Sequence, residues 1–214
     1  MTRHNTIIAL EGLPVIVAFA AISGACWAFG WCWAAILTTA LTVFTLSFFR
    51  NPERHAPEGE GLVVSPADGR VVHVGEVEED RYLNAKMLKI SIFMSVFNVH
   101  VNRMPETGKI TGIRYNPGKF VSANLDKASL DNEQNALIME TSGGKRLMFV
   151  QIAGLVARRI VCWVKPGDTL RRGERFGLIM FGSRLDVYLP FGAEAKVMVG
   201  DKTRAGETVI GTIH

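Results

Sequence analysis

The chain has 214 residues, a formal net charge of +4 and a calculated pI near 9.1, and its mean hydropathy of +0.19 is high for a soluble protein. Its three cysteines contain no CxxC pair, which excludes a disulfide framework and favours a reducing compartment.

The high hydropathy comes from one tract near the N-terminus. Residues 12–49 carry no formal charge, and these roughly 38 residues are about twice what one membrane-spanning helix needs. The tract is too long for a cleaved signal peptide and shows no small-residue cleavage site. Gly24 and Gly30, together with polar Ser23, predict a turn between two helices of roughly 17 to 19 residues each. A single tilted span and helices lying in the membrane surface are the alternatives to this hairpin.

Basic residues flank the tract on both sides, with Arg3 before it and Arg50 and Arg54 after it. The positive-inside rule therefore places both ends, and the globular part that follows, on the cytosolic side of the cell membrane. A basic chain suits either anionic lipid or nucleic acid. Because no recognised nucleic-acid motif is present, we expect lipid and no nucleic acid as the partner.

The domain organisation follows from a change of composition at Arg50. Residues 1–50 form a membrane-anchoring segment, and residues 51–61, with two prolines and mixed charges, indicate a linker. Residues 62–214 form a mainly β domain, because short apolar runs rich in β-branched residues follow one another. The expected strands are 69–77, 87–93, 97–103, 108–115, 136–141, 146–153 and 160–164.

A degenerate repeat indicates the type of β fold. Residues 164–168 with 172–174, and then 199–201 with 205–207, each predict a strand, a turn and a strand. This pattern resembles the barrel-sandwich hybrid of lipoyl and biotinyl carrier domains. No lysine stands on a tight turn at the place where those domains carry their modified residue, so the fold is predicted without the carrier function.

The dipeptide Gly182-Ser183 is a candidate self-cleavage site. A serine hydroxyl can attack the preceding carbonyl to give an ester, whose β-elimination and hydrolysis leave an N-terminal pyruvoyl group. Gly182 lacks a Cβ and therefore allows the strained turn that this acyl shift needs. Taken alone, Gly-Ser more often marks an ordinary turn.

Three motifs support the chemical interpretation of this dipeptide. They are residues 65–69 (SPADG), 94–103 (MSVFNVHVNR) and 181–184 (FGSR), in this order along the chain. Together with residues 116–120 and 151–154 they resemble the phosphatidylserine decarboxylase family, and more narrowly its short prokaryotic type. The resemblance extends from the hydrophobic N-terminus to the last expected strand.

The resemblance implies an enzyme that cleaves itself between Gly182 and Ser183. The products are a large β chain of residues 1–182 and a small α chain of residues 183–214, which form a heterodimer; whether this assembles further is left open. The implied reaction converts phosphatidylserine in the bilayer to phosphatidylethanolamine and CO₂ on a pyruvoyl cofactor derived from Ser183. Such a ketone delocalises the electrons of the broken bond without pyridoxal phosphate or a metal. The scattered histidines and cysteines predict no metal site.

The catalytic residues implied by the resemblance are Ser183, His100 and Asp68. His100, the only histidine within a motif, has an unperturbed pKa of about 6.5 and suits proton transfer. Asp68 suits the third place of an Asp-His-Ser set, although Asp-Gly is also a common turn pair. Asn98 and Arg103 stand where longer members carry an Asp and a second His. His100 therefore serves both self-cleavage and decarboxylation, or self-cleavage uses another base.

A buried anionic headgroup requires charge-assisted partners. Arg103, Lys119, Arg158 and Arg159 are the candidates for its phosphate or carboxylate, and Phe120 is a candidate for packing against the substrate.

Two other functions remain open from the sequence. A membrane-anchored adaptor with a lipoyl-like fold would use Gly182-Ser183 only as a turn and would stay one intact chain. A pyruvoyl enzyme acting on a soluble amino acid is the other alternative, and the apolar N-terminus and residues 98–103 count against it.

Overall fold

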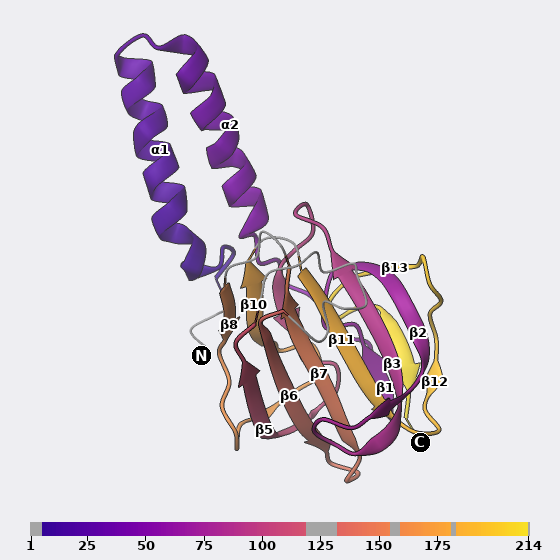
Figure 1. The fold of residues 1–214 in the computed structure, drawn as a ribbon. Helices are drawn as coiled ribbons and strands as arrows, with labels where there is room; N and C mark the ends of the chain where they lie inside the picture. The colour runs from indigo at the N-terminus through magenta and orange to yellow at the C-terminus, as the bar shows by residue number, and fades with distance from the viewer. Residues whose placement is uncertain (1–5, 119–131, 155–158, 181–182, 214) are drawn as a thin grey trace. The chain divides into compact units, whose positions relative to one another are not determined.

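A computed structural model describes residues 6–118, 132–154, 159–180 and 183–213. The chain divides into two compact units, Met1–Glu53 and Arg54–His214. The first unit is helical and the second is almost entirely β (Figure 1). The prediction of a mainly β protein with an N-terminal helical hairpin is therefore confirmed, and the division falls inside the predicted linker. The closer likeness to a barrel-sandwich hybrid stays a prediction.

The first unit is an antiparallel pair of apolar helices. A 3-10 turn, Leu10–Gly12, leads into α1 (Leu13–Ala28), and α2 (Cys32–Phe48) follows a short connection in which Gly30 has a φ of 72°. That left-handed conformation favours glycine. Of the described residues, Leu10–Ala28 is the one helical stretch long and apolar enough to cross a membrane by length and composition, while Cys32–Phe48 is slightly shorter.

Polar contacts hold the two helices together despite their apolar surfaces. Ser23 Oγ and Thr39 Oγ1 lie 2.7 Å apart, and Trp27 Nε1 donates to the same Thr39 oxygen at 3.3 Å. At the open end, the amide of Ala9 donates to the carbonyl of Phe49 at 2.8 Å. The turn predicted near Gly24 and Gly30 therefore occurs at Gly30, and Gly24 continues α1.

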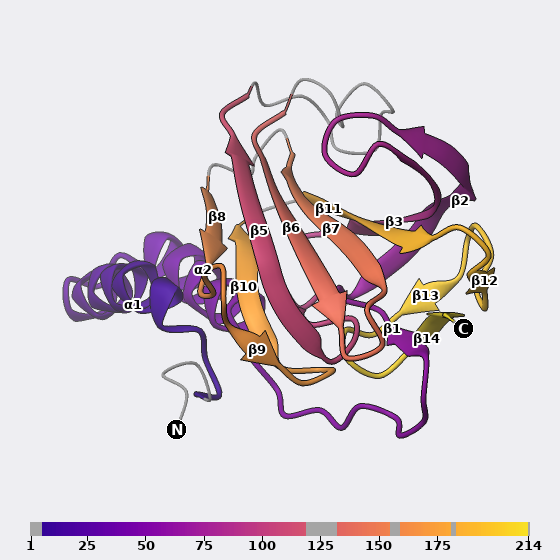
Figure 2. The same ribbon diagram turned by 90° about the horizontal axis from the view of Figure 1, so that it is seen from below.

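The second unit consists of antiparallel strands in three sheets (Figures 1 and 2). The largest sheet has eight strands in the order β13-β2-β3-β11-β7-β6-β5-β9, and two three-stranded sheets have the orders β4-β10-β8 and β1-β14-β12. The strands are β1 (Leu62–Val64), β2 (Gly69–Glu79), β3 (Ala85–Met94), β4 (Val101–Arg103), β5 (Gly108–Asn116), β6 (Gln134–Thr141), β7 (Arg146–Ala153), β8 (Arg159–Cys162), β9 (Thr169–Leu170), β10 (Arg175–Met180), β11 (Ser183–Pro190), β12 (Glu194–Ala195), β13 (Lys202–Thr203) and β14 (Val209–Thr212).

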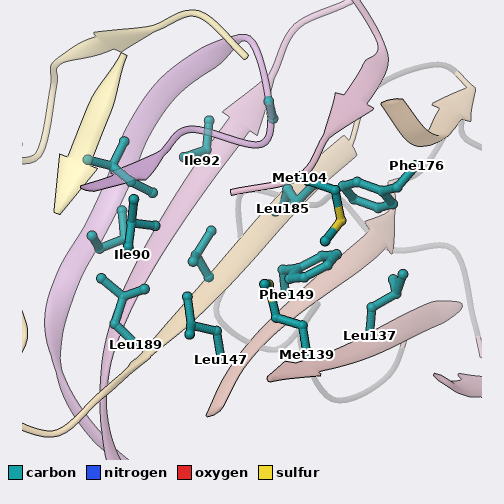
Figure 3. Close-up of a cluster of buried hydrophobic side chains, with 14 of the residues drawn as sticks. Ile90, Ile92, Met104, Leu137, Met139, Leu147, Phe149, Phe176, Leu185 and Leu189 are labelled. Atoms are coloured by element: carbon teal, nitrogen blue, oxygen red, sulfur yellow. The ribbon is translucent and has the colours of Figure 1, made fainter. Parts of the chain in front are cut away.

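One apolar core joins these sheets. Figure 3 shows side chains of β3, β6, β7 and β11 meeting Phe176 of β10 and Met104. Phe149 of β7 and Phe176 have ring centroids 4.8 Å apart, so the large sheet packs directly on the β4-β10-β8 sheet. Alternation along β11 sends Leu185, Val187 and Leu189 into this core.

The two predicted repeat units meet in space. Gly173 and Gly206 each turn the chain with a positive φ, 81° and 77°, and a Cβ on Gly206 would lie 3.5 Å from the Cα of Gly173. Arg103 lies between the two turns, where it is 3% exposed and donates from Nη1 to the carbonyl oxygen of Gly173 at 2.8 Å. The repeat therefore builds a double turn around one buried guanidinium.

Candidate active site

Ser183 is the first residue of β11, the strand between β3 and β7 in the large sheet. It pairs with Met94 on one side and with Ala153 on the other, and its side chain is fully buried. Strand alternation places it on the same face as the core residue Leu185. Its hydroxyl donates to Met94 Sδ at 3.3 Å. A serine at a core-facing position beside a weak acceptor is unusual, because a buried hydroxyl normally has a strong partner. Its neighbour Gly182 lies outside the described residues.

His100 lies at the end of a tight turn that follows β3. Asn98 closes this turn, since its Oδ1 accepts hydrogen bonds from the amide and the hydroxyl of Ser95 at 2.8 and 2.9 Å. His100 is 2% exposed, and its Nδ1 lies 3.0 Å from the carbonyl oxygen of Asn98. The carbonyl of His100 accepts from the amide of Ile179 in β10, four residues before Ser183. The backbone thus brings His100 next to the strand that enters the cleavage site.

Asp68 precedes β2 and is bound by Arg54. The guanidinium of Arg54 contacts both carboxylate oxygens, with Nη2 2.9 Å from Oδ2, and the amide of Ala205 donates to Oδ1 at 2.7 Å. Burial opposes the charged form of Arg54, but the hydrogen bond and charge of Asp68 outweigh it, so the pKa of Arg54 lies above its ordinary value. The same turn is tied to β4, because the amide of Arg103 donates to the carbonyl of Pro66 at 2.9 Å.

The structure therefore places the three predicted catalytic residues in one end of the β unit without a described hydrogen bond from one to another. β2 begins beside the end of β3, and the end of β3 pairs with Ser183, so Asp68 lies two strands from Ser183, about 10 Å at ordinary strand spacing. The described side-chain hydrogen bonds of Asp68 go to Arg54 and Ala205. The side chain of His100 contacts Asn98, and that of Ser183 contacts Met94.

The predicted headgroup residues differ in position. Arg159 is exposed and pairs with Met180 at the end of β10, three residues before Ser183. Arg103 is buried in the double turn, where its Nη1 donates to the carbonyl oxygen of Gly173, and it stays a candidate from the sequence. Lys119, Phe120 and Arg158 lie outside the described residues.

The opposite face of β11 carries a separate charged cluster. Asp186 is fully buried there, with Arg184 Nε 2.8 Å from Oδ1 and Lys89 Nζ 3.1 Å from Oδ2. A cavity of about 230 Å³ lies on this face below the turn that follows β2. Burial, with the charge of Asp186 added, raises the pKa of Tyr188, which lines the cavity. Ser183 points to the other face of the strand, so this cavity is separate from the candidate active site.

Three contributors to the site were assigned no role from the sequence. Met94 accepts the Ser183 hydroxyl, and Asn102 and Gln151 are fully buried amides in β4 and β7. The sequence does contain a signal for Gln151, because it interrupts the apolar strand β7 at a position where burial requires a partner. Among the residues that the structure describes, no group of three His, Cys, Asp or Glu side chains is placed to hold a metal ion.

Comparison with known proteins identifies the family. Residues 41–211 match the model of the family described as phosphatidylserine decarboxylase. A phosphatidylserine decarboxylase proenzyme of Syntrophus aciditrophicus is 54% identical over 211 residues, which cover 98% of this chain and 99% of the relative. The proteins of the same name from Geotalea daltonii and Burkholderia ambifaria are 51% and 49% identical, with 99% and 100% of both chains covered. With matches of this extent, the chain belongs to the phosphatidylserine decarboxylase family.

Proposed function

We propose that this chain is the self-processing proenzyme of a phosphatidylserine decarboxylase, which converts phosphatidylserine to phosphatidylethanolamine and CO₂. The observation that carries the proposal is the fully buried Ser183 at the start of β11, with His100 bonded to the preceding strand, in a chain of this family. The relatives are named as proenzymes, which agrees with processing into two chains.

Self-cleavage begins when Ser183 Oγ forms a bond to the carbonyl carbon of Gly182 and its proton passes to a base. The peptide C–N bond then breaks and the nitrogen takes a proton, which leaves an ester. Removal of the Ser183 Cα proton breaks the Cβ–O bond, so that residue 182 ends in a carboxylate and residue 183 becomes dehydroalanine. Hydrolysis consumes one water and releases one ammonia, and a pyruvoyl group remains.

The strand order supports a stable pair of chains after cleavage. β10 ends the described part of the large chain before the cleavage site, whereas β11 begins the small chain. β11 pairs over most of its length with β3 on one side and with β7 on the other, and both of these belong to the large chain. The small chain would therefore stay inserted in the sheet as a heterodimer. No described strand pairing has to break when the peptide bond does.

The pyruvoyl group supplies an electrophilic ketone that takes up the electrons of the departing carboxylate. The side-chain environment of Ser183 fits it, because the product carries a methyl group where serine carries its hydroxymethyl group. Met94 Sδ, which the hydroxyl now contacts, is a soft neighbour for a methyl group. The scheme uses neither pyridoxal phosphate nor a metal.

We assign His100 to proton transfer, because it is a buried imidazole whose backbone is bonded to the strand that enters the cleavage site. We propose Asp68 as a positioning residue for His100. The turn that contains Asp68 is hydrogen-bonded through Pro66 to Arg103, in the strand that follows His100. Arg159, exposed beside the end of β10, is the described candidate for the anionic headgroup. Arg103, Lys119, Phe120 and Arg158 remain candidates from the sequence.

We propose that the helical hairpin anchors the enzyme in the cell membrane and that the catalytic unit works on its cytosolic face. Exposed side chains at the end of the β unit that holds Ser183 support access to a lipid. Phe97, in the turn before His100, is 74% exposed, and Arg70, Lys202 and Arg159 are exposed cations at strand ends there. A basic side chain near an anionic bilayer contributes about 1 kcal/mol to membrane binding.

Intact mass under denaturing conditions tests the proposal. We expect two chains divided between Gly182 and Ser183, with the small chain carrying a pyruvoyl group, not an amino-terminal serine, at its start. The purified protein should then release CO₂ from phosphatidylserine vesicles but not from free serine. An uncleaved chain that persists in membranes would contradict the proposal and would agree with an adaptor, while release from free serine would indicate a soluble substrate.

A further inference from the structure

A line of three buried amides crosses the β unit toward Ser183. Asn135 Nδ2 donates to Gln151 Oε1 at 3.0 Å, and Gln151 Nε2 donates to Asn102 Oδ1 at 2.9 Å. The three residues come from β6, β7 and β4 and are 3% exposed or less. Buried amides cost free energy unless they are hydrogen-bonded, so each of them depends on the next.

The directions of these hydrogen bonds fix how each amide is oriented. Asn135 presents its amino group to Gln151. Gln151 therefore accepts from Asn135 and donates to Asn102. Because the oxygen of Asn102 accepts from Gln151, its amino group points toward Met94.

The near end of the line meets the nucleophile at a shared thioether. Asn102 Nδ2 lies 3.8 Å from Met94 Sδ, and the Ser183 hydroxyl donates to the same sulfur at 3.3 Å. A thioether is only a weak acceptor, so neither donor is held strongly. An amide that exchanges a thioether for a negatively charged oxygen gains a much stronger hydrogen bond.

We propose that Asn102 is a catalytic hydrogen-bond donor in self-cleavage and that Gln151 and Asn135 position it. When Ser183 Oγ attacks, the carbonyl oxygen of Gly182 becomes negatively charged. The Asn102 amide, whose orientation is set before the reaction, would stabilise this charge. Met94 then suits Ser183 both before and after its hydroxyl reacts, because the Met94 sulfur loses only a weak hydrogen bond. The inference rests on the proposed function, since it concerns the cleavage step of that reaction.

The variant Gln151→Glu tests the orientation of Asn102 without removing it. When the introduced carboxyl group is protonated, it has one donor and one acceptor, as the glutamine amide has in this line, and keeps Asn102 in place. When that group is ionised it only accepts, so Asn102 would turn its amino group toward the carboxylate and its oxygen toward Met94. Self-cleavage of Q151E should therefore fall as the pH rises through the pKa of the introduced carboxyl group, beyond any change in the wild type.

Cleavage is followed on denaturing gels after cell-free synthesis in the presence of phospholipid vesicles, at a series of pH values. Asn102→Ala and the near-isosteric Asn102→Asp should each cleave about 100-fold more slowly, the loss typical of one missing donor to a developing oxyanion. Gln134→Glu is the matched control, because Gln134 is also buried and in the large sheet but accepts from Arg81 at 3.4 Å. It should cleave like the wild type at every pH.

Normal cleavage of the Asn102 variants, or of Q151E at all pH values, would overturn the inference. Equal slowing of Q134E would do the same, because it would show a general effect of a new carboxylate. Thermal unfolding of the Ser183→Ala forms of these variants, which cannot cleave, reports folding separately. Failure of the wild type to cleave would instead contradict the proposed function.

Discussion

Arg54 and Asp68 form a buried ion pair in which the guanidinium contacts both carboxylate oxygens, with side chains only 4% and 11% exposed. Arg54 also donates to the carbonyl of Ala205, while the amide of Ala205 donates back to Asp68. The pair therefore ties the start of the catalytic unit to the turn that we propose positions His100.

Asp68→Ala should destabilise the protein and slow its self-cleavage. It leaves the Arg54 guanidinium buried without its counter-ion, which typically costs about 3–5 kcal/mol of the free energy of unfolding. Denaturant unfolding in detergent, on a Ser183→Ala background, would measure the loss.

The double variant Arg54→Met with Asp68→Ala removes both charges and should recover part of the lost stability. Recovery of cleavage together with stability would support a positioning role for Asp68. Cleavage that stays absent in a stable double variant would show instead that the carboxylate acts directly in the chemistry.

Gly69→Ala should separate β2 from β3 next to this pair. A Cβ at Gly69 would lie 2.1 Å from the carbonyl oxygen of Phe93, a backbone atom that cannot move without breaking the strand pairing. Gly75→Ala, on the same strand, meets nothing closer than His73 Nε2 at 3.4 Å. We expect a lower melting temperature and impaired cleavage for G69A alone; equal behaviour of the two variants would contradict this prediction.

Regular strands were predictable because their pattern is local. The strand expected at residues 146–153 occurs with the same bounds as β7. The strand expected at residues 97–103 starts only at Val101, since Asn98 bonds to Ser95 and closes a turn there. Such side-chain bonds to nearby backbone compete with strand formation even where the apolar pattern favours it.

The site was predictable where its residues form motifs and unpredictable where they meet across sheets. Ser183 and His100 were recognised from short motifs. The bond from Gln151 to Asn102 joins residues 49 positions apart in two sheets, and no local pattern encodes it. Arg54, the partner of Asp68, stands among charged and proline residues, and this local composition predicts only a linker.

Cys162 should react slowly with iodoacetamide in the folded protein near neutral pH. Burial raises the pKa of its thiol above the ordinary value, against hydrogen bonds with Val164 and Asn135 that lower it, and only the thiolate is nucleophilic. The stabilisation linked to this shift is complete below the ordinary thiol pKa and is lost as the pH rises through the folded value. Mass spectrometry can compare alkylation of Cys162 in folded and guanidinium-unfolded protein, and Cys162→Ala should lack this alkaline loss of stability. Equal alkylation rates in the two states would contradict the prediction.

Phe97→Ser should lower activity on phosphatidylserine in vesicles while leaving self-cleavage intact. Phe97 is 74% exposed in the turn that carries His100, so we expect its ring to enter the bilayer interface beside the site. Phe191→Ser is the matched control, because Phe191 is 63% exposed just beyond the opposite end of β11. Both variants should process short-chain phosphatidylserine in solution at the wild-type rate, and only F97S should lose activity on vesicles. Equal vesicle activity of the two variants would show that the Phe97 turn does not contact lipid, and a loss on the soluble substrate would place Phe97 in the active site itself.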